Sequence, residues 1–301
     1  MAITYHAGRR VQGTSTGAGW SIDGASYDSV SFSVASQDTA PTCIRFKDDG
    51  TKMYMLGSND TVYQYTLSTS WDISTASYDS VSFSTGSQDT NSFKIDFKSD
   101  GTKMYMLGIN NNIVYQYTLS SAWVISTASY DSVSFSVGSQ DTAPRGMTFK
   151  PDGTKMYIAG VSNDTIYQYT LSSAWDMSTA SYDSVSFSVA SQDANPVGIV
   201  FKDDGTKISM IGITTATVYQ YTLSTAWDVS TASYDSVSFS ITGQDSSPRG
   251  MTFKSDGTKM YMVGVTSDTV YQYTTSSSDS TLLTNAQVGS RFEETDTRKM
   301  Y

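Results

Sequence analysis

The sequence repeats itself five times, and a tryptophan marks each copy. The tryptophans are Trp20, Trp71, Trp123, Trp175 and Trp227, so the copies start 51 or 52 residues apart. Three segments, DGTK, YQYT and YDSVSFS, recur in step with them. A four-strand repeat of this length is typical of propeller blades, whereas leucine-rich and helical solenoid repeats carry different patterns.

One copy predicts four short β-strands. In the third copy they cover residues 144–150, 154–160, 165–172 and 182–189. Gly153 can adopt a positive φ in the tight turn after the first strand. In the fourth strand, strict alternation places Val185 and Phe187 on the packed face, and Tyr182 with the serines on the other face. A strand with one serine-rich face fits the outer edge of a sheet.

The repeat therefore predicts an all-β fold, a five-bladed β-propeller of four-stranded antiparallel blades. The chain begins with a link and an outer strand (residues 20–34), whereas the last copy stops after its third strand. We predict that residues 27–34 pair with residues 270–274, so that the N-terminal outer strand completes the last blade and closes the ring. The predicted parts are an N-terminal arm (1–19), the propeller (20–274) and a C-terminal tail (275–301).

Composition excludes several classes of function. The chain has one His and one Cys, which argues against disulfide frameworks, Cys/His zinc sites and nucleophile–His catalysis. With 19 Lys and Arg against 29 Asp and Glu, the net charge is −10, so nucleic acid is not an expected partner. The N-terminus lacks an apolar core and no apolar run is long enough to span a bilayer, so neither a signal peptide nor membrane insertion is expected. No cofactor is expected.

The blade core resembles the YVTN and NHL propeller repeats. The resemblance rests on the pattern PxGMTFKxDGTKMYxxG at residues 144–160 and 248–264. It implies the architecture alone, because propellers host enzymes, binders and scaffolds alike.

The two ends carry a second resemblance. Residues 5–13 and 285–301 resemble segments that bracket exchangeable middle domains in virion-structural proteins of phages and viruses known mostly from environmental sequence. This implies that residues 1–19 and 275–301 bind other virion proteins, and that the propeller is displayed on the virion surface. The alternative is that both ends are solvated tails.

A Gln-Asp pair precedes the first strand of every copy. These links are expected on one face around the channel, where five converging carboxylates could hold Ca²⁺ or hydrogen-bond a sugar. The alternative is that each Asp caps its own turn, and identical recurrence in every blade favours that structural role. The residues are Gln37, Asp38, Gln88, Asp89, Gln140, Asp141, Gln192, Asp193, Gln244 and Asp245.

The copies disagree most on the first strand, which would line the channel. One position reads Thr42, Phe93, Arg145, Val197 and Arg249 across the five copies. This predicts an asymmetric pocket with Phe93, Arg145 and Arg249 near its mouth. Three positions further along, Arg45 and Asp96 occupy equivalent levels in neighbouring blades, and a cross-blade ion pair is the favoured interpretation.

The tryptophans are a further candidate site. Pockets between blades lined by Trp71, Trp123, Trp175 and Trp227 could stack on sugar rings, although packing against the blade edge is favoured. The only glutamates, Glu293 and Glu294, lie in the tail, and a glycosidase needs two placed carboxylates. The sequence thus predicts a non-enzymatic virion surface protein that attaches to a host-surface receptor or glycan. The alternatives are a five-fold lectin not tied to a virus and a purely structural decoration protein.

Overall fold

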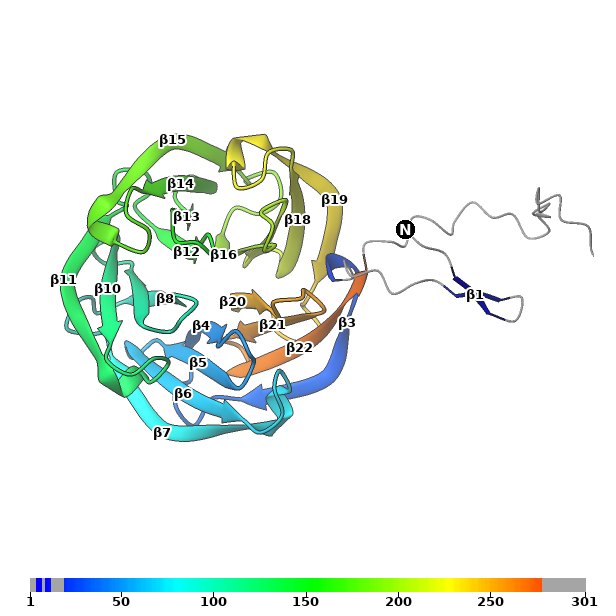
Figure 1. Ribbon diagram of the computed structural model, residues 1–301, viewed down its shortest axis with the longest axis horizontal. Coiled ribbons are helices and arrows are strands. Elements are labelled where there is room, and N and C mark those ends of the chain that lie inside the picture. Colours follow the sequence, from blue (N-terminus) through cyan, green and yellow to red (C-terminus); the bar gives the residue numbers. More distant parts are fainter. Residues whose placement is uncertain (1–3, 7–8, 12–18, 278–301) are drawn as a thin grey trace, which may run out of the picture.

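Five four-stranded antiparallel sheets stand around a central axis like the blades of a propeller (Figure 1). The computed structural model describes residues 4–6, 9–11 and 19–277. In every blade the first strand lies nearest the axis and the fourth forms the outer rim. The predicted all-β, five-bladed fold is therefore confirmed.

The strands of the five blades follow the repeat closely. Blade 1 contains β4 (Pro41–Phe46), β5 (Lys52–Gly57), β6 (Thr61–Leu67) and β7 (Ala76–Ser84), and blade 2 contains β8 (Ser92–Phe97), β9 (Lys103–Gly108), β10 (Ile113–Leu119) and β11 (Ala128–Ser136). Blade 3 contains β12 (Pro144–Phe149), β13 (Lys155–Gly160), β14 (Thr165–Leu171) and β15 (Ala180–Ser188), and blade 4 contains β16 (Pro196–Phe201), β17 (Lys207–Gly212), β18 (Thr217–Leu223) and β19 (Ala232–Ser240). Blade 5 contains β20 (Pro248–Phe253), β21 (Lys259–Gly264), β22 (Thr269–Ser277) and β3 (Trp20–Ser33).

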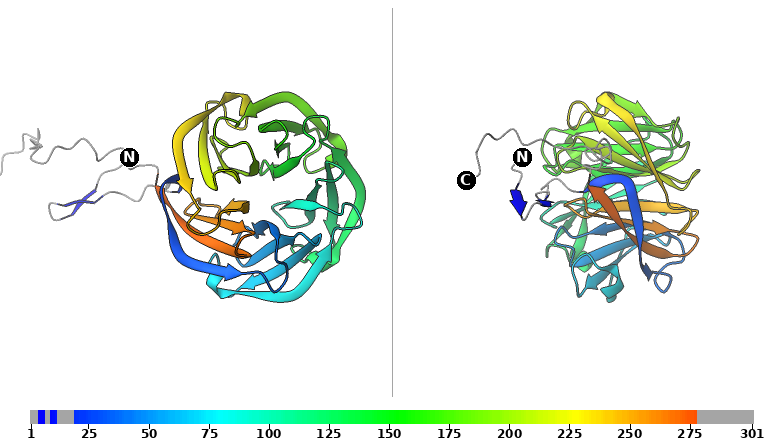
Figure 2. Two further views of the ribbon diagram at one scale, coloured as in Figure 1. Left: turned by 180° about the vertical axis from the view of Figure 1, so that it is seen from behind. Right: turned by 90° about the vertical axis from the view of Figure 1, so that its right-hand side faces the viewer.

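The ring closes where the sequence predicts. β3 pairs with β22, with Ser33 opposite Thr269 and Ser26 opposite Thr274, and Figure 2 shows the two strands side by side at the edge of the disc. The pairing extends beyond the prediction, to Trp20 opposite Ser277. In the last blade β22 itself continues along the residues that begin the link in the other copies.

In the other four copies, that link contains a short 3₁₀ turn. The turns are η1 (Ile73–Thr75), η2 (Ile125–Thr127), η3 (Met177–Thr179) and η4 (Val229–Thr231). Asp72 caps the first of them by accepting a hydrogen bond from Ser74 N at 3.0 Å, as an N-cap carboxylate does.

The predicted alternation of the outer strand is confirmed, although the strand carries a bulge that the sequence did not predict. A β-bulge shifts the register, so that Tyr182 pairs with Tyr169 while Val185 pairs with Gln168. Ser184 in the bulge has φ 59°. Because the bulge adds two residues, Tyr182 stays on the face opposite to Val185, where its ring lies 5.5 Å from that of Tyr169. The period of two on which the prediction rested therefore survives the bulge.

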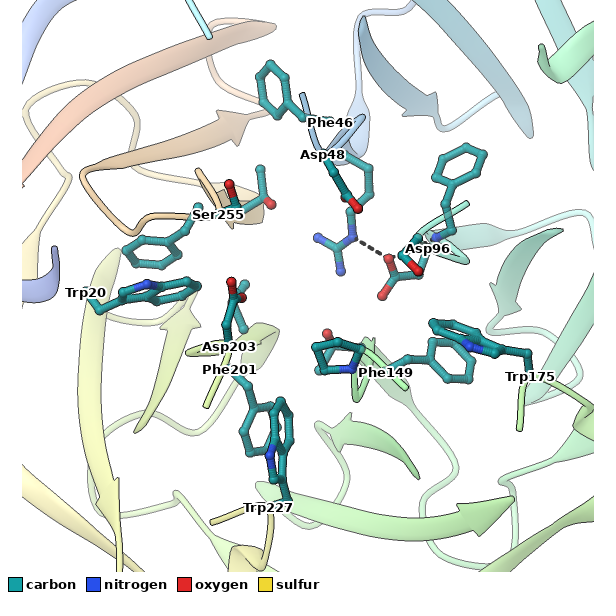
Figure 3. A pocket seen from close by; sticks show the side chains of 18 of the residues that line it. Trp20, Phe46, Asp48, Asp96, Phe149, Trp175, Phe201, Asp203, Trp227 and Ser255 are labelled. Carbon is teal, nitrogen blue, oxygen red and sulfur yellow. Dashed lines mark hydrogen bonds and ion pairs between the residues drawn. The ribbon is translucent and has the colours of Figure 1, made fainter. Parts of the chain in front are cut away.

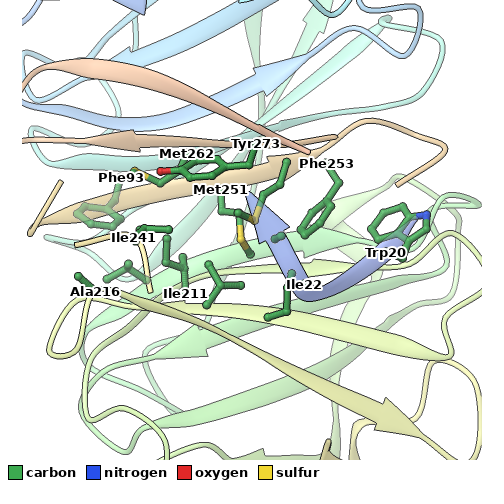
Figure 4. Packing of buried hydrophobic residues seen from close by; sticks show 14 residues of the cluster. Trp20, Ile22, Phe93, Ile211, Ala216, Ile241, Met251, Phe253, Met262 and Tyr273 are labelled. Carbon is green, nitrogen blue, oxygen red and sulfur yellow. The ribbon is translucent and has the colours of Figure 1, made fainter. Parts of the chain in front are cut away.

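Hydrophobic clusters fill the space between neighbouring blades. The cluster between blades 4 and 5 includes Ile211, Met251 and Met262, and β3 adds Trp20 and Ile22 to it (Figure 4). The N-terminal strand thus contributes to the interblade core as well as to the sheet.

A buried glutamine from the YQYT segment also joins each blade to the next. Gln64 Oε1 accepts from the backbone N–H of Ile125 in blade 2 at 3.3 Å, and its Nε2 donates to Asp79 at 2.8 Å. Gln220 and Gln272 make the same interblade bond to Ile22 and Ile73, so the pattern continues across the ring closure.

The structure describes only short parts of the two ends of the chain. β1 (Thr4–His6) and β2 (Arg9–Val11) pair as an antiparallel hairpin within the predicted arm. The remaining positions of the two proposed attachment segments, apart from the strand ends at residues 19 and 275–277, lie outside the described residues. None of the helices in the described part of the chain is long and apolar enough to cross a membrane.

Candidate functional site

The central channel has two different mouths. The first strand of each blade begins at the Gln-Asp link and ends at the DGTK turn, so these two segments lie at opposite ends of the channel. We call the end at the links (residues 35–40 and their equivalents) the QD mouth. The end at the turns (residues 47–51 and their equivalents) is the DG mouth.

The aspartates of the QD links hold their own blades together. Asp38 accepts from Ala40 N at 2.7 Å and from Asn59 N at 3.2 Å, which ties the link to the turn between β5 and β6. A Cβ on Gly57 would lie 2.6 Å from Asp38 Cγ, which explains the glycine at this position in every copy. The aspartates of all five pairs are at most 8% exposed: Asp38, Asp89, Asp141, Asp193 and Asp245.

The paired glutamines have a matching role. Gln37 Oε1 accepts from the hydroxyl of Tyr65 at 3.1 Å, and Gln88, Gln140, Gln192 and Gln244 accept from the equivalent tyrosines. In residues 19–277 no three His, Cys, Asp or Glu side chains are grouped to hold a metal. The calcium ring considered from the sequence is therefore wrong, because each carboxylate accepts hydrogen bonds from backbone N–H groups of its own blade.

The tryptophans are joints between blades. Trp123 is 8% exposed, and its carbonyl accepts from the hydroxyl of Tyr54 in the preceding blade at 2.7 Å. Tyr54 stacks on one side of the indole at 6.1 Å, and a Cβ on Gly101 would lie only 2.3 Å from the ring. Trp175, Trp227 and Trp71 make the same carbonyl bond. The tryptophans therefore pack against the blades, which is the interpretation that the sequence favoured, because the ring faces needed for sugar stacking are covered.

The DG mouth contains a cup of about 380 Å³ on the channel axis. Its wall consists of five phenylalanines from the ends of the first strands together with four tryptophan edges: Phe46, Phe97, Phe149, Phe201, Phe253, Trp20, Trp71, Trp175 and Trp227. Its rim carries one residue from each DGTK turn: Asp48, Ser99, Pro151, Asp203 and Ser255. In Figure 3 the carboxylates of Asp48, Asp96 and Asp203 point toward the middle of the cup, with the aromatic rings around them.

The floor of the cup is polar. Arg45 Nε lies 3.2 Å from Asp96 Oδ1, so the cross-blade ion pair predicted from the sequence is confirmed. Thr148, Val200 and Thr252 occupy the same level in the other three blades.

The two rim carboxylates have no hydrogen-bond donor among the described residues. Partial removal from water, together with repulsion by Asp96 and Asp203, raises the pKa of Asp48 above its usual range. Burial and the neighbouring Asp204 raise the pKa of Asp203 in the same way. Both carboxylates are therefore free to accept hydrogen bonds from a ligand.

The QD mouth is filled and basic. Phe93 is 6% exposed, and Lys94 Nζ and Arg145 Cζ lie 5.0 Å and 5.3 Å from its ring centre. Lys94 Nζ donates to the carbonyls of Thr42, at 3.0 Å, and of Arg249. Burial lowers the pKa of Lys94 to about 7, and nearby arginines lower it further. Phe93, Arg145 and Arg249 thus lie together around the plug that Phe93 and Lys94 form, and the asymmetric pocket expected there stays a prediction.

The rim residues of the DG mouth were missed at the sequence level. The signal was present, because the position before each DGTK reads Asp, Ser, Pro, Asp and Ser in the five copies. A comparison of the five copies at the DGTK turns, like the one at the first strand, identifies Asp48 and Asp203. Lys94, which follows Phe93 on the first strand of blade 2, was missed as well.

The fold and its two mouths define a five-bladed β-propeller with an acidic cup at one end of the axis and a basic plug at the other. No protein-family model and no curated protein matches the chain. The likeness to YVTN and NHL repeats and to virion proteins therefore stays a prediction.

Solved structures share the fold at low identity. A "putative 6-phosphogluconolactonase" from Bacteroides fragilis is 12% identical with a TM-score of 0.45 over 67% of this chain and 55% of its own. A second protein so described, from Bacteroides uniformis, is 12% identical with a TM-score of 0.47 over 74% and 64% of the two chains. A functionally unknown protein from Desulfotomaculum acetoxidans is 14% identical with a TM-score of 0.48 over 74% and 79%. The chain spans less than two thirds of the two Bacteroides proteins.

These names correct one prediction. The sequence predicted a protein that is not an enzyme, yet two similar structures are described as lactonases. The prediction of a non-enzymatic protein is therefore withdrawn. At such identity the likeness concerns the fold alone, and no reaction is transferred to this chain.

Proposed function

We propose that the cup at the DG mouth binds a carbohydrate. The observation that carries the proposal is a pair of carboxylates above an aromatic wall, Asp48 and Asp203, which have no hydrogen-bond partner among the described residues. A volume of about 380 Å³ lies within the range of about 300–1,000 Å³ typical of small-molecule sites.

The residues of the cup match the chemistry of a sugar. Sugar hydroxyls donate hydrogen bonds to carboxylates, and Ser99 and Ser255 can both donate and accept at the rim. The phenylalanine and tryptophan edges offer apolar contacts for the C–H groups of the ring. The proposed sugar site thus lies at the mouth opposite to the one predicted from the sequence. The sugar would contact aromatic edges there, whereas the prediction relied on stacking against tryptophan faces.

A glycan array followed by calorimetric titration of the best glycan tests this proposal. The variant Asp48→Ser/Asp203→Ser uses the residue that blades 2 and 5 carry at this position, so it should fold. We expect it to lose about 10-fold or more in affinity, because each carboxylate hydrogen bond contributes about 1.5–3 kcal/mol. Asp23→Asn, an exposed change outside the cup, is the matched control. Wild-type protein that binds no glycan, or equal affinity in the double variant, contradicts the proposal.

We further propose that the propeller is displayed on a virus particle for attachment to a host surface. The support is the resemblance of the two ends to virion-structural segments; a five-fold lectin without a particle and a decoration protein are the alternatives. Deleting residues 1–18 and 278–301 leaves the described ring intact. If the truncated protein is incorporated into particles as well as the full chain, the attachment role is wrong.

A further inference from the structure

Three cationic side chains differ from all others in the ring. Within residues 19–277, every Lys and Arg forms an ion pair with an aspartate except Lys94, Arg145 and Arg249. All three lie together at the QD mouth. In a chain with a net charge of −10, this is a local concentration of uncompensated positive charge.

The two arginines repel each other and have no acceptor in the described residues. The charge of Arg145, together with burial, lowers the pKa of Arg249. Arg145 Nε is buried without a hydrogen-bond partner. Asp245 is the carboxylate whose charge acts on Arg249. It already accepts hydrogen bonds from Ser247 N at 2.7 Å and from Ser267 N at 3.0 Å.

The surroundings hold the Arg145 guanidinium at the mouth. Arg145 rests over the ring of Phe93, and the repeat offers only the short side chains of Thr42 and Val197 at the two remaining equivalent positions. Lys94 lies beneath, with Nζ directed at backbone carbonyls. The forks of two guanidinium groups match the oxygens of a tetrahedral oxyanion, which can accept several N–H bonds at once.

We propose that Arg145 and Arg249 bind an oxyanion at the QD mouth, either free phosphate or sulfate or the phosphate or sulfate ester of a sugar. The site is separate from the cup, because Arg45 and Asp96 occupy the axis between them. An anion there offsets the mutual repulsion of the two arginines and supplies the hydrogen bond that Arg145 Nε lacks within the described residues.

Calorimetric titration with inorganic phosphate and inorganic sulfate tests the site, at constant ionic strength set with chloride. N-acetylglucosamine 6-sulfate, compared with N-acetylglucosamine, distinguishes an ester from the free ion. The variant Arg145→Thr/Arg249→Thr takes the residue found at position 42. We expect it to bind about 10- to 100-fold more weakly, since hydrogen bonds to charged groups contribute about 1.5–3 kcal/mol each.

Two further variants keep the result interpretable. Lys98→Gln/Lys254→Gln removes two charges at the DG turns and should leave the affinity unchanged. Arg145→Lys/Arg249→Lys keeps the charge but loses the forks, and an intermediate affinity is expected. The proposal is overturned if wild-type protein binds neither ion nor the ester at 10 mM (roughly the weakest affinity that would matter), or if the threonine and control variants bind alike.

Discussion

The guanidinium of Arg45 in blade 1 forms an ion pair with the carboxylate of Asp96 in blade 2, with Nε 3.2 Å from Oδ1. The same guanidinium donates to the carbonyl oxygens of Met147 in blade 3, at 3.0 Å, and of Met251 in blade 5, at 3.3 Å. One side chain thus links the first strands of four blades across the axis. At the same level the other three copies carry the shorter side chains of Thr148, Val200 and Thr252.

Removing one partner of this pair should destabilise the ring. Asp96→Thr leaves the Arg45 charge buried without a carboxylate, so we expect a loss of about 2–4 kcal/mol in the free energy of unfolding. Arg45→Thr/Asp96→Thr, which gives both positions the threonine of blades 3 and 5, should lose less than the sum of the single changes. Urea denaturation of all four proteins measures the coupling, and additivity within about 0.5 kcal/mol would show that the pair contributes nothing.

Stability should rise with pH because of Lys94. Its pKa is about 7 in the fold, below the usual 10.5, so between these values the unfolded chain holds a proton that the folded chain has released. Unfolding is therefore disfavoured increasingly as pH rises from about 7 to about 10. Lys94→Met should flatten this rise and add about 1–3 kcal/mol at pH 7. Denaturation curves at pH 7, 8.5 and 10 test it, with the partly exposed Lys254→Met at a DGTK turn as control; parallel pH profiles for wild type and Lys94→Met would refute the assignment.

Asp164 and Asp268 should be replaceable by asparagine with a gain in stability. In blade 1 the equivalent Asp60 accepts from Ser92 N at 2.7 Å, but Pro196 and Pro41 stand at the positions facing Asp164 and Asp268 and have no N–H. Their Oδ1 atoms are buried without a partner, and burial raises the pKa of both carboxyl groups.

The neutral form of these two groups is thus favoured in the fold, and the stability it brings is lost as pH rises through the folded pKa. Asparagine mimics that form, and Asn112 at the same position can donate to Ile109 O at 3.1 Å and Thr142 O at 3.2 Å. Asp164→Asn should therefore raise the free energy of unfolding at pH 7 by about 0.5–1.5 kcal/mol, as measured by urea denaturation. Asp60→Asn should not, and equal effects at both positions would contradict this account.

The glycines of the DGTK turns should not tolerate even a methyl group. Gly153 has φ +73°, and a Cβ there would lie 2.3 Å from the indole of Trp175. Gly153→Ala should lower the free energy of unfolding by about 2–4 kcal/mol, through strain and displacement of the tryptophan. Gly243→Ala is the control, because nothing lies within 4 Å of its added Cβ. Thermal denaturation of the two variants should separate them clearly, whereas equal melting temperatures would contradict the packing of the indole on the turn.

The closing strand should restore the ring when it is supplied as a separate peptide. A chain lacking residues 1–34 exposes the edge of β22 and loses Trp20 and Ile22 from the last interblade core. We expect this chain to unfold or associate, because an open edge invites pairing with another chain. A synthetic peptide of residues 19–34 should restore a cooperative monomer in sedimentation and thermal melts. A peptide with Trp20→Ser and Ile22→Ser is the control, and a stable monomer without any peptide would show that closure is dispensable.

The period in the sequence determined the fold. Five copies with four strands each, the missing fourth strand of the last copy and the outer strand before Val34 were enough to predict the blades and their closure. They were enough because each blade repeats one local pattern of alternation and turns. The same comparison of copies identified Arg45 with Asp96, and drew attention to Phe93, Arg145 and Arg249.

What the tertiary structure decided is where side chains meet across blades. The bulge at Ser184 adds two residues and so keeps Tyr182 on the face opposite to Val185, and the closed ring packs both faces, Tyr182 against one interblade cluster and Val185 against the next. Gln-Asp pairs and tryptophans that could have formed sites are occupied by contacts within and between blades. Asp48 and Asp203, two blades apart in the ring, form one rim only because all five DGTK turns converge on the axis. A linear pattern records which residues recur, but distances across the ring depend on how the blades close.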